Sequence, residues 1–202
     1  MNRGQLAHAV RSARVITAGQ CEFVVVGSQA VLAHIASDGH EGSPLFVSME
    51  VDLLPLTADL SVEESLADVV GVLLGDSTPF HQSFDFQVDG VQRSSLVLAD
   101  GWESRVVDVV IDGEVLDGVH ALSLPDLVVS KAYAGREKDW AYIRELVKFH
   151  VPVLDQVRPL LESLPQDPFR DRALAIWSSV GARWIAPPDR VSVLESRGNK
   201  GP

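Results

Sequence analysis

The feature that most constrains the fold is a short apolar run that stops at a glycine and a serine. Residues 23–26 (Phe-Val-Val-Val) are apolar and mostly β-branched, which predicts a buried strand that ends at Gly27. Ser28 then opens an apolar-periodic run over residues 30–35, which predicts a helix with Ser28 at or near its N-cap. The start of a helix presents free backbone N–H groups and the positive end of the helix dipole. This turn is therefore a predicted binding site for phosphate.

The segment at residues 47–54 alternates between apolar and polar side chains. This alternation predicts a strand on which Glu50 and Asp52 share one face, roughly 6.5–7 Å apart along the backbone. Two carboxylates on one face repel each other unless a positive charge lies between them, and Mg²⁺ favours one or two carboxylates together with substrate phosphates. The pair therefore predicts a metal site. The alternative is two solvated acids on an edge strand, but the apolar Leu53 and Leu54 that follow favour a central strand.

Helical spacing of apolar residues predicts six further helices. They lie at residues 5–18, 62–74, 124–134, 136–149, 153–163 and 168–182. Ser61, with Glu64 three residues on, is the expected cap of the second of these helices. Ser123 and Asp126 form the expected cap of the third, which Gly135 is expected to end.

Three further short strands are predicted, at residues 83–88, 94–98 and 105–111. Asp89-Gly90 is a hairpin signal between the first two, and Asp112-Gly113 marks another turn. Residues 37–45, between the two halves of the predicted site, are rich in glycine and other helix breakers. This loop either covers a bound nucleotide or is a plain connector.

The length of 202 residues fits one domain with a helical extension. We expect a core over residues 1–122, a helical part packed on it over residues 123–185, and a flexible tail over residues 186–202. No apolar run approaches the roughly 18 residues of a membrane helix, and the N-terminus lacks the apolar region of a signal peptide. The single Cys21 excludes an intrachain disulfide, so we expect a cytoplasmic protein without a membrane partner.

The charge is distributed unevenly along the chain. The net charge is −11, which argues against a nucleic-acid partner. Residues 1–128 hold 5 basic and 19 acidic side chains, whereas residues 129–202 hold 12 basic and 9 acidic ones. A polynucleotide, if one binds, should therefore lie on the C-terminal part. The alternative is a solvated helical surface of mixed charge.

The order of these motifs resembles the nucleotidyltransferase superfamily of the DNA polymerase beta type. Its signature is a Gly-Ser turn followed by an Asp-x-Asp pair on a neighbouring strand, and this chain has Gly27-Ser28 and Glu50-Val51-Asp52. Residues 122–139 (Leu-Ser-Leu-Pro-Asp-Leu-Val-Val-Ser-Lys-Ala-Tyr-Ala-Gly-Arg-Glu-Lys-Asp) resemble a stretch of the nucleotidyltransferase-like proteins related to the AbiEii and MenT toxins. The resemblance covers roughly residues 5 to 150. It implies an α/β fold with a mixed sheet flanked by helices and a C-terminal helical part.

The resemblance also assigns roles within the second motif. Lys131 matches an active-site lysine that neutralises triphosphate charge, and the alternative is a lysine whose stem packs on the core. Asp139 matches an acid that faces the site, and the alternative is an acid in the first turn of a helix, stabilised by the helix dipole. Arg136 is a candidate contact for phosphate or RNA, and the alternative is a surface arginine.

Four positions match the superfamily pattern less closely. Asp108 is the candidate third metal ligand, with a surface-facing acid as the alternative. Trp102 is expected to pack in the core and Arg105 to approach the nucleotide. Glu50 stands where the pattern has Asp, which moves the carboxylate outward by about 1.3 Å. Because Mg²⁺ demands tight octahedral geometry, this change either shifts the coordination or removes one metal position.

Together these features predict an Mg²⁺-dependent nucleotidyltransferase. An acceptor hydroxyl would attack the α-phosphorus of an NTP such as ATP, while Mg²⁺ on Glu50 and Asp52 neutralises the phosphate charge. The MenT resemblance implies the toxin of a toxin–antitoxin pair, with a tRNA 3′ end or another RNA as acceptor and a cognate antitoxin as partner. Two alternatives stay open. One is the addition of AMP to a protein, which the acidity favours, and the other is a nucleotide-binding module without catalysis, which Glu50 favours.

Overall fold

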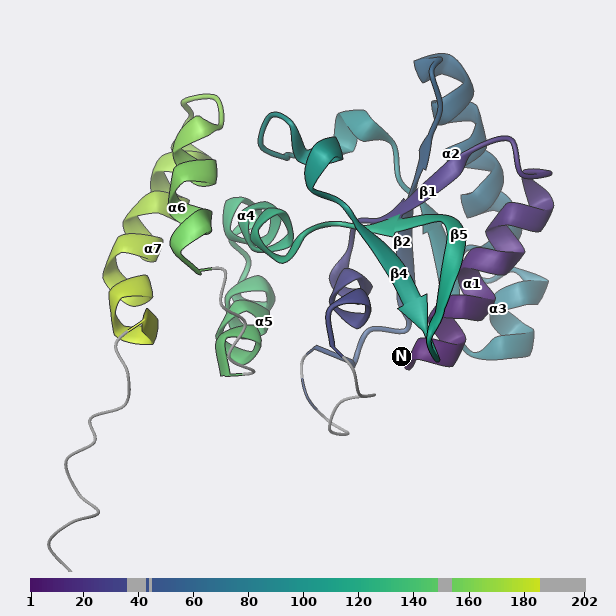
Figure 1. Cartoon of the computed structure of the whole chain (residues 1–202), viewed down its shortest axis with the longest axis horizontal. Helices are drawn as coiled ribbons and strands as arrows, with labels where there is room; N and C mark the ends of the chain where they lie inside the picture. Colours follow the sequence, from purple (N-terminus) through teal and green to yellow (C-terminus); the bar gives the residue numbers. More distant parts are fainter. Residues whose placement is uncertain (36–42, 44, 149–153, 186–202) are drawn as a thin grey trace, which may run out of the picture.

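The computed structural model describes residues 1–35, 43, 45–148 and 154–185. The described part is a mixed sheet flanked by helices, which confirms the expected α/β fold (Figure 1). Its strands are β1 (Glu22–Val25), β2 (Glu50–Leu56), β3 (Gln87–Gly90), β4 (Val107–Ile111) and β5 (Glu114–Ala121). Their order across the sheet is β3-β2-β1-β5-β4.

The centre of the sheet is β1, which pairs antiparallel with β2 and parallel with β5. Phe23, Val24 and Val25 are fully buried, because a strand covered on both faces needs apolar side chains on both. Strand β3 lies parallel to β2 and sets Asp89 opposite Asp52. Acidic residues from two neighbouring strands therefore lie side by side, next to the end of the central strand.

Two groups of helices lie on opposite sides of the sheet in Figure 1. One group comprises α1 (Arg3–Ile16), α2 (Leu60–Leu74) and α3 (Pro79–Phe84). The other comprises α4 (Leu124–Ala134), α5 (Glu137–Lys148), α6 (Leu154–Ser163) and α7 (Pro168–Ile185). Helix α4 packs against α5, α6, α7 and the short 3-10 helix η1 (Ser28–Ala33), so it joins the C-terminal helices to the sheet.

Two helix starts differ from the prediction. The segment after β1 is the six-residue 3-10 helix η1 instead of a full helix, and its N-cap is Gly27, so Ser28 lies next to the N-cap as predicted. Helix α2 begins two residues earlier than expected because Asp59, not Ser61, caps it. The Asp59 carboxylate accepts hydrogen bonds from both the backbone N–H and the hydroxyl of Ser61, at 2.9 and 2.7 Å. Ser61 therefore donates hydrogen bonds to the N-cap residue Asp59 and is not the N-cap itself.

The predicted ends of α4 are confirmed. The Ser123 hydroxyl accepts a hydrogen bond from the backbone N–H of Asp126 at 3.2 Å, and Gly135 ends the helix with a φ of 63°. The predicted turn at Asp112 and Gly113 joins β4 to β5, and both residues have positive φ. The cap at Ser123, the helix end at Gly135 and this turn each depend on the type of one or two residues, so the sequence alone predicted them.

The predicted strand at residues 94–98 and the hairpin before it are wrong. The segment forms the short 3-10 helix η2 (Arg93–Ser95), and Asp89 and Gly90 are the last residues of β3. Gly90 is required there by close packing on α2, because a Cβ atom would lie 1.8 Å from the carbonyl oxygen of Ala67. Strand β5 was not predicted, since its first four residues are exposed or only half-buried and lack an apolar alternation.

Trp102 is buried, as expected. Cys21 is buried as well, and burial raises the pKa of its thiol. None of the helices in the described ranges is both long and apolar enough to span a bilayer. Most of the loop at residues 37–45 and the whole tail at residues 186–202 lie outside the described residues.

Candidate active site

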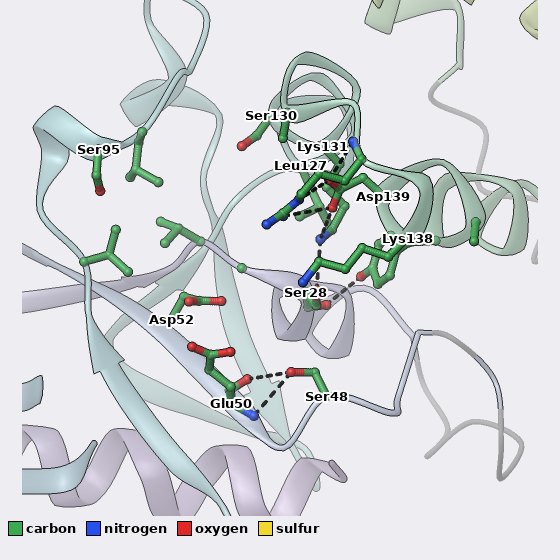
Figure 2. Close-up of a pocket in the computed structure, with 18 of the residues that line it drawn as sticks. Ser28, Ser48, Glu50, Asp52, Ser95, Leu127, Ser130, Lys131, Lys138 and Asp139 are labelled. Carbon is green, nitrogen blue, oxygen red and sulfur yellow. Dashed lines mark hydrogen bonds and ion pairs between the residues drawn. The ribbon is translucent and has the colours of Figure 1, made fainter. Parts of the chain in front are cut away.

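One cavity of about 800 Å³ collects most of the predicted site residues. Its walls come from Gly27 and Ser28 after β1, Glu50 and Asp52 on β2, the segment 91–96 after β3, and helices α4 and α5. Figure 2 shows the lysines of α4 and α5 on one side of the hollow and Ser95 on the other, with the two β2 acids between them. Segments far apart in the sequence thus meet where the central strands end.

Gly27 allows the turn after β1 to lie directly against β2. The backbone N–H of Val26 donates to the carbonyl oxygen of Asp52 at 3.0 Å, which ties the two strands together at this point. A Cβ atom on Gly27 would lie 1.5 Å from the Asp52 carboxylate. The glycine is therefore required by the acid beside it, and a larger residue would displace one or the other.

Three carboxylates meet beside the cavity, which two of them line. Glu50 and Asp52 share one face of β2, and Asp89 joins them from β3, with one oxygen of each residue within 4.8 Å of the others. A hydrogen bond to Asp89, burial and the charge of Asp52 raise the pKa of Glu50 to about 7. Burial and the charge of Asp89 likewise raise the pKa of Asp52. The site therefore carries more negative charge than its surroundings stabilise.

This cluster fits a divalent cation. Hard cations such as Mg²⁺ and Ca²⁺ take carboxylate oxygens as ligands, and three half-buried carboxylates on rigid strands supply them. The raised pKa values of Glu50 and Asp52 show that a positive charge between them would relieve an unfavourable arrangement. The donor atoms, the charge and the half-burial all match such an ion.

Lys131 of α4 is held in place by contacts with two segments. Its Nζ donates a hydrogen bond to the hydroxyl of Ser28 at 2.9 Å and lies 4.3 Å from the ring centroid of Tyr142. The Tyr142 hydroxyl donates in turn to the Ser28 carbonyl. Burial lowers the pKa of Lys131, against the opposing charges of Asp139 and Asp52. The lysine is thus a fixed group that faces the cavity, not a mobile surface residue.

Asp139 supports this lysine and an arginine at once. Its side chain is 2% exposed and lies 3.9 Å from Lys131, and it accepts hydrogen bonds from the backbone and the guanidinium of Arg136 at 2.6–3.2 Å. Arg136 keeps 61% of its side chain exposed and lines the cavity, as does Lys138. One wall of the cavity therefore presents three cations, and a single buried carboxylate supports two of them, Lys131 and Arg136.

Comparison with known proteins identifies the family. Residues 5–164 match the model of a family described as "Nucleotidyltransferase of unknown function (DUF6036)". The chain belongs to this nucleotidyltransferase family. No curated protein and no solved structure matches the chain. Family membership supports nucleotide transfer with an NTP as substrate, and it bears out the superfamily part of the predicted resemblance but not the narrower AbiEii and MenT part.

In this family member, two predicted site residues lie away from the cavity. Arg105 does not face a nucleotide, because Asp126 holds its guanidinium with hydrogen bonds of 2.9 and 2.7 Å. Asp108 does not join the carboxylate cluster, because β4 is the far edge of the sheet from β3. The Asp108 side chain is 63% exposed and lies 3.1 Å from His120 of β5. Neither residue is among those that line the cavity.

Three residues at or beside this nucleotidyltransferase's cavity were missed by sequence reasoning. Asp89 lies in the carboxylate cluster that Asp108 was expected to join. Its alternation with Gln87 was a signal for a strand, but the dipeptide Asp89-Gly90 was interpreted as a turn instead. Lys138 lines the cavity from the first turn of α5. Tyr142 lies one helical turn after Asp139, so the spacing that placed one toward the site could have placed both.

Proposed function

We propose that this protein transfers a nucleotide from an NTP to an acceptor hydroxyl, with Mg²⁺ as cofactor. The observation that carries the proposal is that Lys131, on Ser28, lines the same cavity as Glu50 and Asp52, which Asp89 joins in one carboxylate cluster. Cations on one wall and carboxylates at the base match a triphosphate with a metal ion beside it. The match to a nucleotidyltransferase family supports the same reaction class.

The cationic wall would bind the triphosphate. Lys131, Lys138 and Arg136 would neutralise the negative charge that develops as pyrophosphate leaves, and the Arg136 side chain is 61% exposed, so a phosphate can reach it. Asp139 would keep Lys131 and Arg136 oriented without entering the reaction. Ser28 would place its hydroxyl and the adjoining backbone beside the phosphates, as Tyr142 holds its carbonyl.

The carboxylates would hold the metal ion. Glu50, Asp52 and Asp89 are the residues that would bind it, and when bound it would neutralise the α-phosphate and orient the attacking hydroxyl. Glu50 is longer by one methylene than the Asp of the superfamily pattern. In this structure Glu50 reaches Asp89, so the longer side chain still lies within the cluster. We therefore propose that the site keeps its function with Glu at this position.

The acceptor is the part of the proposal that rests on resemblance alone. The MenT and AbiEii likeness names the tRNA 3′ end as acceptor, and with it a toxin role and a cognate antitoxin. A protein hydroxyl that receives AMP is the second candidate. The described charges favour it, because residues 123–185 hold nine basic and eight acidic side chains while residues 1–122 hold five basic and eighteen acidic ones.

Label transfer tests the proposal. The protein is incubated with radiolabelled NTPs, Mg²⁺, total tRNA and cell-extract protein, and the label is followed on each fraction. We expect transfer that requires Mg²⁺ and is lost in Asp52→Ala. The matched control is Asp108→Ala, which removes an acid outside the cavity and should retain transfer. Absence of transfer by the unaltered protein, or equal transfer by Asp52→Ala, would reject the proposal.

Calorimetry separates catalysis from binding alone. A nucleotide-binding module without catalysis would bind the NTP but transfer no label, and a structural relic would bind neither metal nor nucleotide. We expect Mg²⁺-dependent NTP binding together with transfer, because the acids and the cations face the same space.

A further inference from the structure

The cavity has two chemically different walls. The cationic wall carries Lys131, Lys138 and Arg136. Opposite it lies the segment 91–96, which contributes Val91, Ser95 and Leu96, and which we call the 91–96 wall. Figure 2 shows Ser95 across the hollow from the two lysines, with Asp52 and Glu50 between them. Among the described residues that line the 91–96 wall, none is lysine or arginine.

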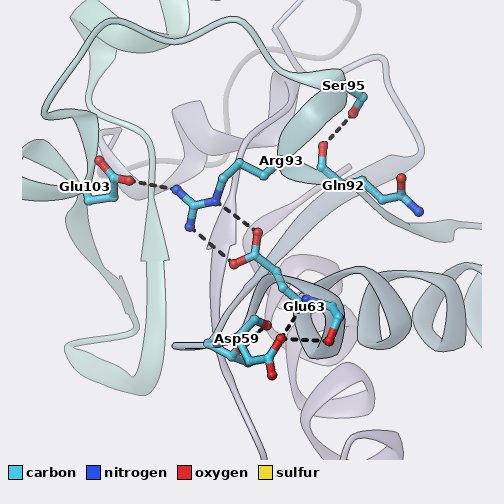
Figure 3. Close-up of polar contacts among 8 residues, drawn as sticks. Asp59, Glu63, Gln92, Arg93, Ser95 and Glu103 are labelled. Carbon is cyan, nitrogen blue, oxygen red and sulfur yellow. Dashed lines mark hydrogen bonds and ion pairs between the residues drawn. The ribbon is translucent and has the colours of Figure 1, made fainter.

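The one cation in this segment is directed away from the cavity. Arg93 is the only lysine or arginine between residues 15 and 104. Its guanidinium binds both carboxylate oxygens of the buried Glu63, at 3.0 and 3.2 Å, and one oxygen of Glu103 at 2.7 Å (Figure 3). It also lies 5.2 Å from the ring centroid of Trp102. These contacts hold Arg93 against α2, and its charge is already paired with two carboxylates.

The side chains beside the 91–96 wall add no cation to it. The exposed Asp68 carboxylate accepts a hydrogen bond from Gln92 at 3.1 Å, and Glu103 is paired with Arg93. The wall itself is apolar at Val91 and Leu96 and carries a hydroxyl at Ser95. Such a surface suits an uncharged or cationic group and offers no cation to a phosphodiester.

In-line displacement assigns this wall to the acceptor. In nucleotidyl transfer the attacking oxygen and the leaving pyrophosphate lie on opposite sides of the α-phosphorus. The cationic wall takes the leaving pyrophosphate under the proposed function, on which this step rests. The acceptor hydroxyl must then approach from the side of Asp89 and the 91–96 wall.

We infer that the 91–96 wall is the acceptor subsite and that its acceptor is a hydroxyl side chain of a protein segment rich in basic residues. The serine, threonine or tyrosine oxygen forms a bond to the α-phosphorus as the bond between the α-phosphorus and its bridging oxygen to the β-phosphate breaks. Pyrophosphate leaves toward the cationic wall, and the hydroxyl proton passes to the carboxylate cluster and on to solvent. The product is a nucleotidylated side chain, with no oxidation or reduction.

Two matched peptides and tRNA test the inference in one assay. Both peptides carry a central serine, flanked by lysines in one and by glutamates in the other. The full chain is incubated with labelled NTPs, Mg²⁺ and an equimolar mixture of the two peptides and total tRNA. We expect the lysine-flanked peptide to receive at least about tenfold more label than the glutamate-flanked one, and tRNA to receive none above background.

A substitution on the wall tests its position. Ser95→Arg places a cation in the 91–96 wall and should raise the KM for the lysine-flanked peptide about tenfold while the KM for the NTP is unchanged. Ser94→Arg is the matched control, since Ser94 is an exposed neighbour that does not line the cavity, and both constants should stay as in the unaltered protein.

Different outcomes would contradict the acceptor subsite and the nucleotide site. Preferential labelling of tRNA, equal labelling of the two peptides, or labelling of neither by a protein that still binds Mg²⁺ and NTP would overturn the acceptor inference and leave the nucleotide site standing. A protein that binds no NTP in calorimetry would contradict the proposed function itself.

Discussion

Lys131 contacts three different residues of the site. It touches the hydroxyl of Ser28 and the ring of Tyr142, and it lies 3.9 Å from Asp139. A lysine in the middle of a helix has an ordinary alternative, with its stem on the core and its charge in water. Here the charge lies in the cavity, with 12% of the side chain exposed. A lysine at this position in a helix can thus place its charge either in water or in a cavity, and the packing of the neighbouring elements determines which.

Replacement of Lys131 should therefore damage transfer more than folding. We expect Lys131→Met to lower kcat by roughly 10²–10³-fold, the usual effect of removing one group that stabilises transition-state charge. Arg11→Met, an exposed change on α1, is the control and should leave kcat unaltered. Steady-state label transfer measures both. A kcat within a factor of two of the unaltered protein would remove Lys131 from the mechanism.

Glu50 makes stability depend on pH and on metal. Its pKa is raised from 4.5 to about 7, so the folded protein holds this proton more tightly than the unfolded chain does. Without divalent ions, the free energy of unfolding should fall as the pH rises from about 4.5 to about 7. Glu50→Gln, which cannot ionise, should melt higher than the unaltered protein at pH 8 and equally at pH 4.

Thermal unfolding in chelator measures this difference. The exposed Glu114→Gln is the control and should show no such pH-dependent gain. Added Mg²⁺ should raise the melting temperature of the unaltered protein at pH 8 and should raise that of Glu50→Gln less. A lower melting temperature for Glu50→Gln at pH 8 in chelator would show that the carboxylate is stabilising there.

At the scale of elements, a buried ion pair fastens the 91–96 wall to α2. The Glu63 side chain is 1% exposed and holds Arg93, whose pKa this hydrogen bond raises (Figure 3). Arg93→Leu leaves the Glu63 carboxylate buried without its partner, and should cost about 3 kcal/mol of unfolding free energy. The double variant Glu63→Leu/Arg93→Leu should recover most of that loss. Urea unfolding checks both, and a single variant as stable as the unaltered protein would show that the pair does not fasten the wall.

Some elements could be predicted from the sequence and others could not. Helix α4, its cap at Ser123 and its end at Gly135 were predictable because each depends on local residue types. The place of Asp89 was not, because the Asp-Gly signal for a turn is local while the parallel pairing of β3 with β2 is not. Arg105 and Asp108 were misplaced for the same reason: their partners, Asp126 and His120, lie at least twelve residues away.

At the scale of the whole molecule, charge separates the possible acceptors. The excess of acidic side chains lies in residues 1–122, and residues 123–185 are nearly balanced. We therefore expect only weak binding of tRNA, with a Kd above about 10 µM at physiological salt. Such a Kd is typical of non-specific binding to nucleic acid, or weaker. Filter binding over a salt series checks this. A nanomolar Kd with a steep salt slope would instead support the RNA acceptor.

The central claim is that three carboxylates and three cations from four segments form one nucleotide site. Titration calorimetry of NTP with and without Mg²⁺ tests it most directly when Asp89→Asn is compared with Asp108→Asn. The account predicts Mg²⁺-dependent binding that Asp89→Asn weakens at least about tenfold and Asp108→Asn leaves unchanged. Binding that ignores Mg²⁺, or that responds equally to the two substitutions, would contradict it.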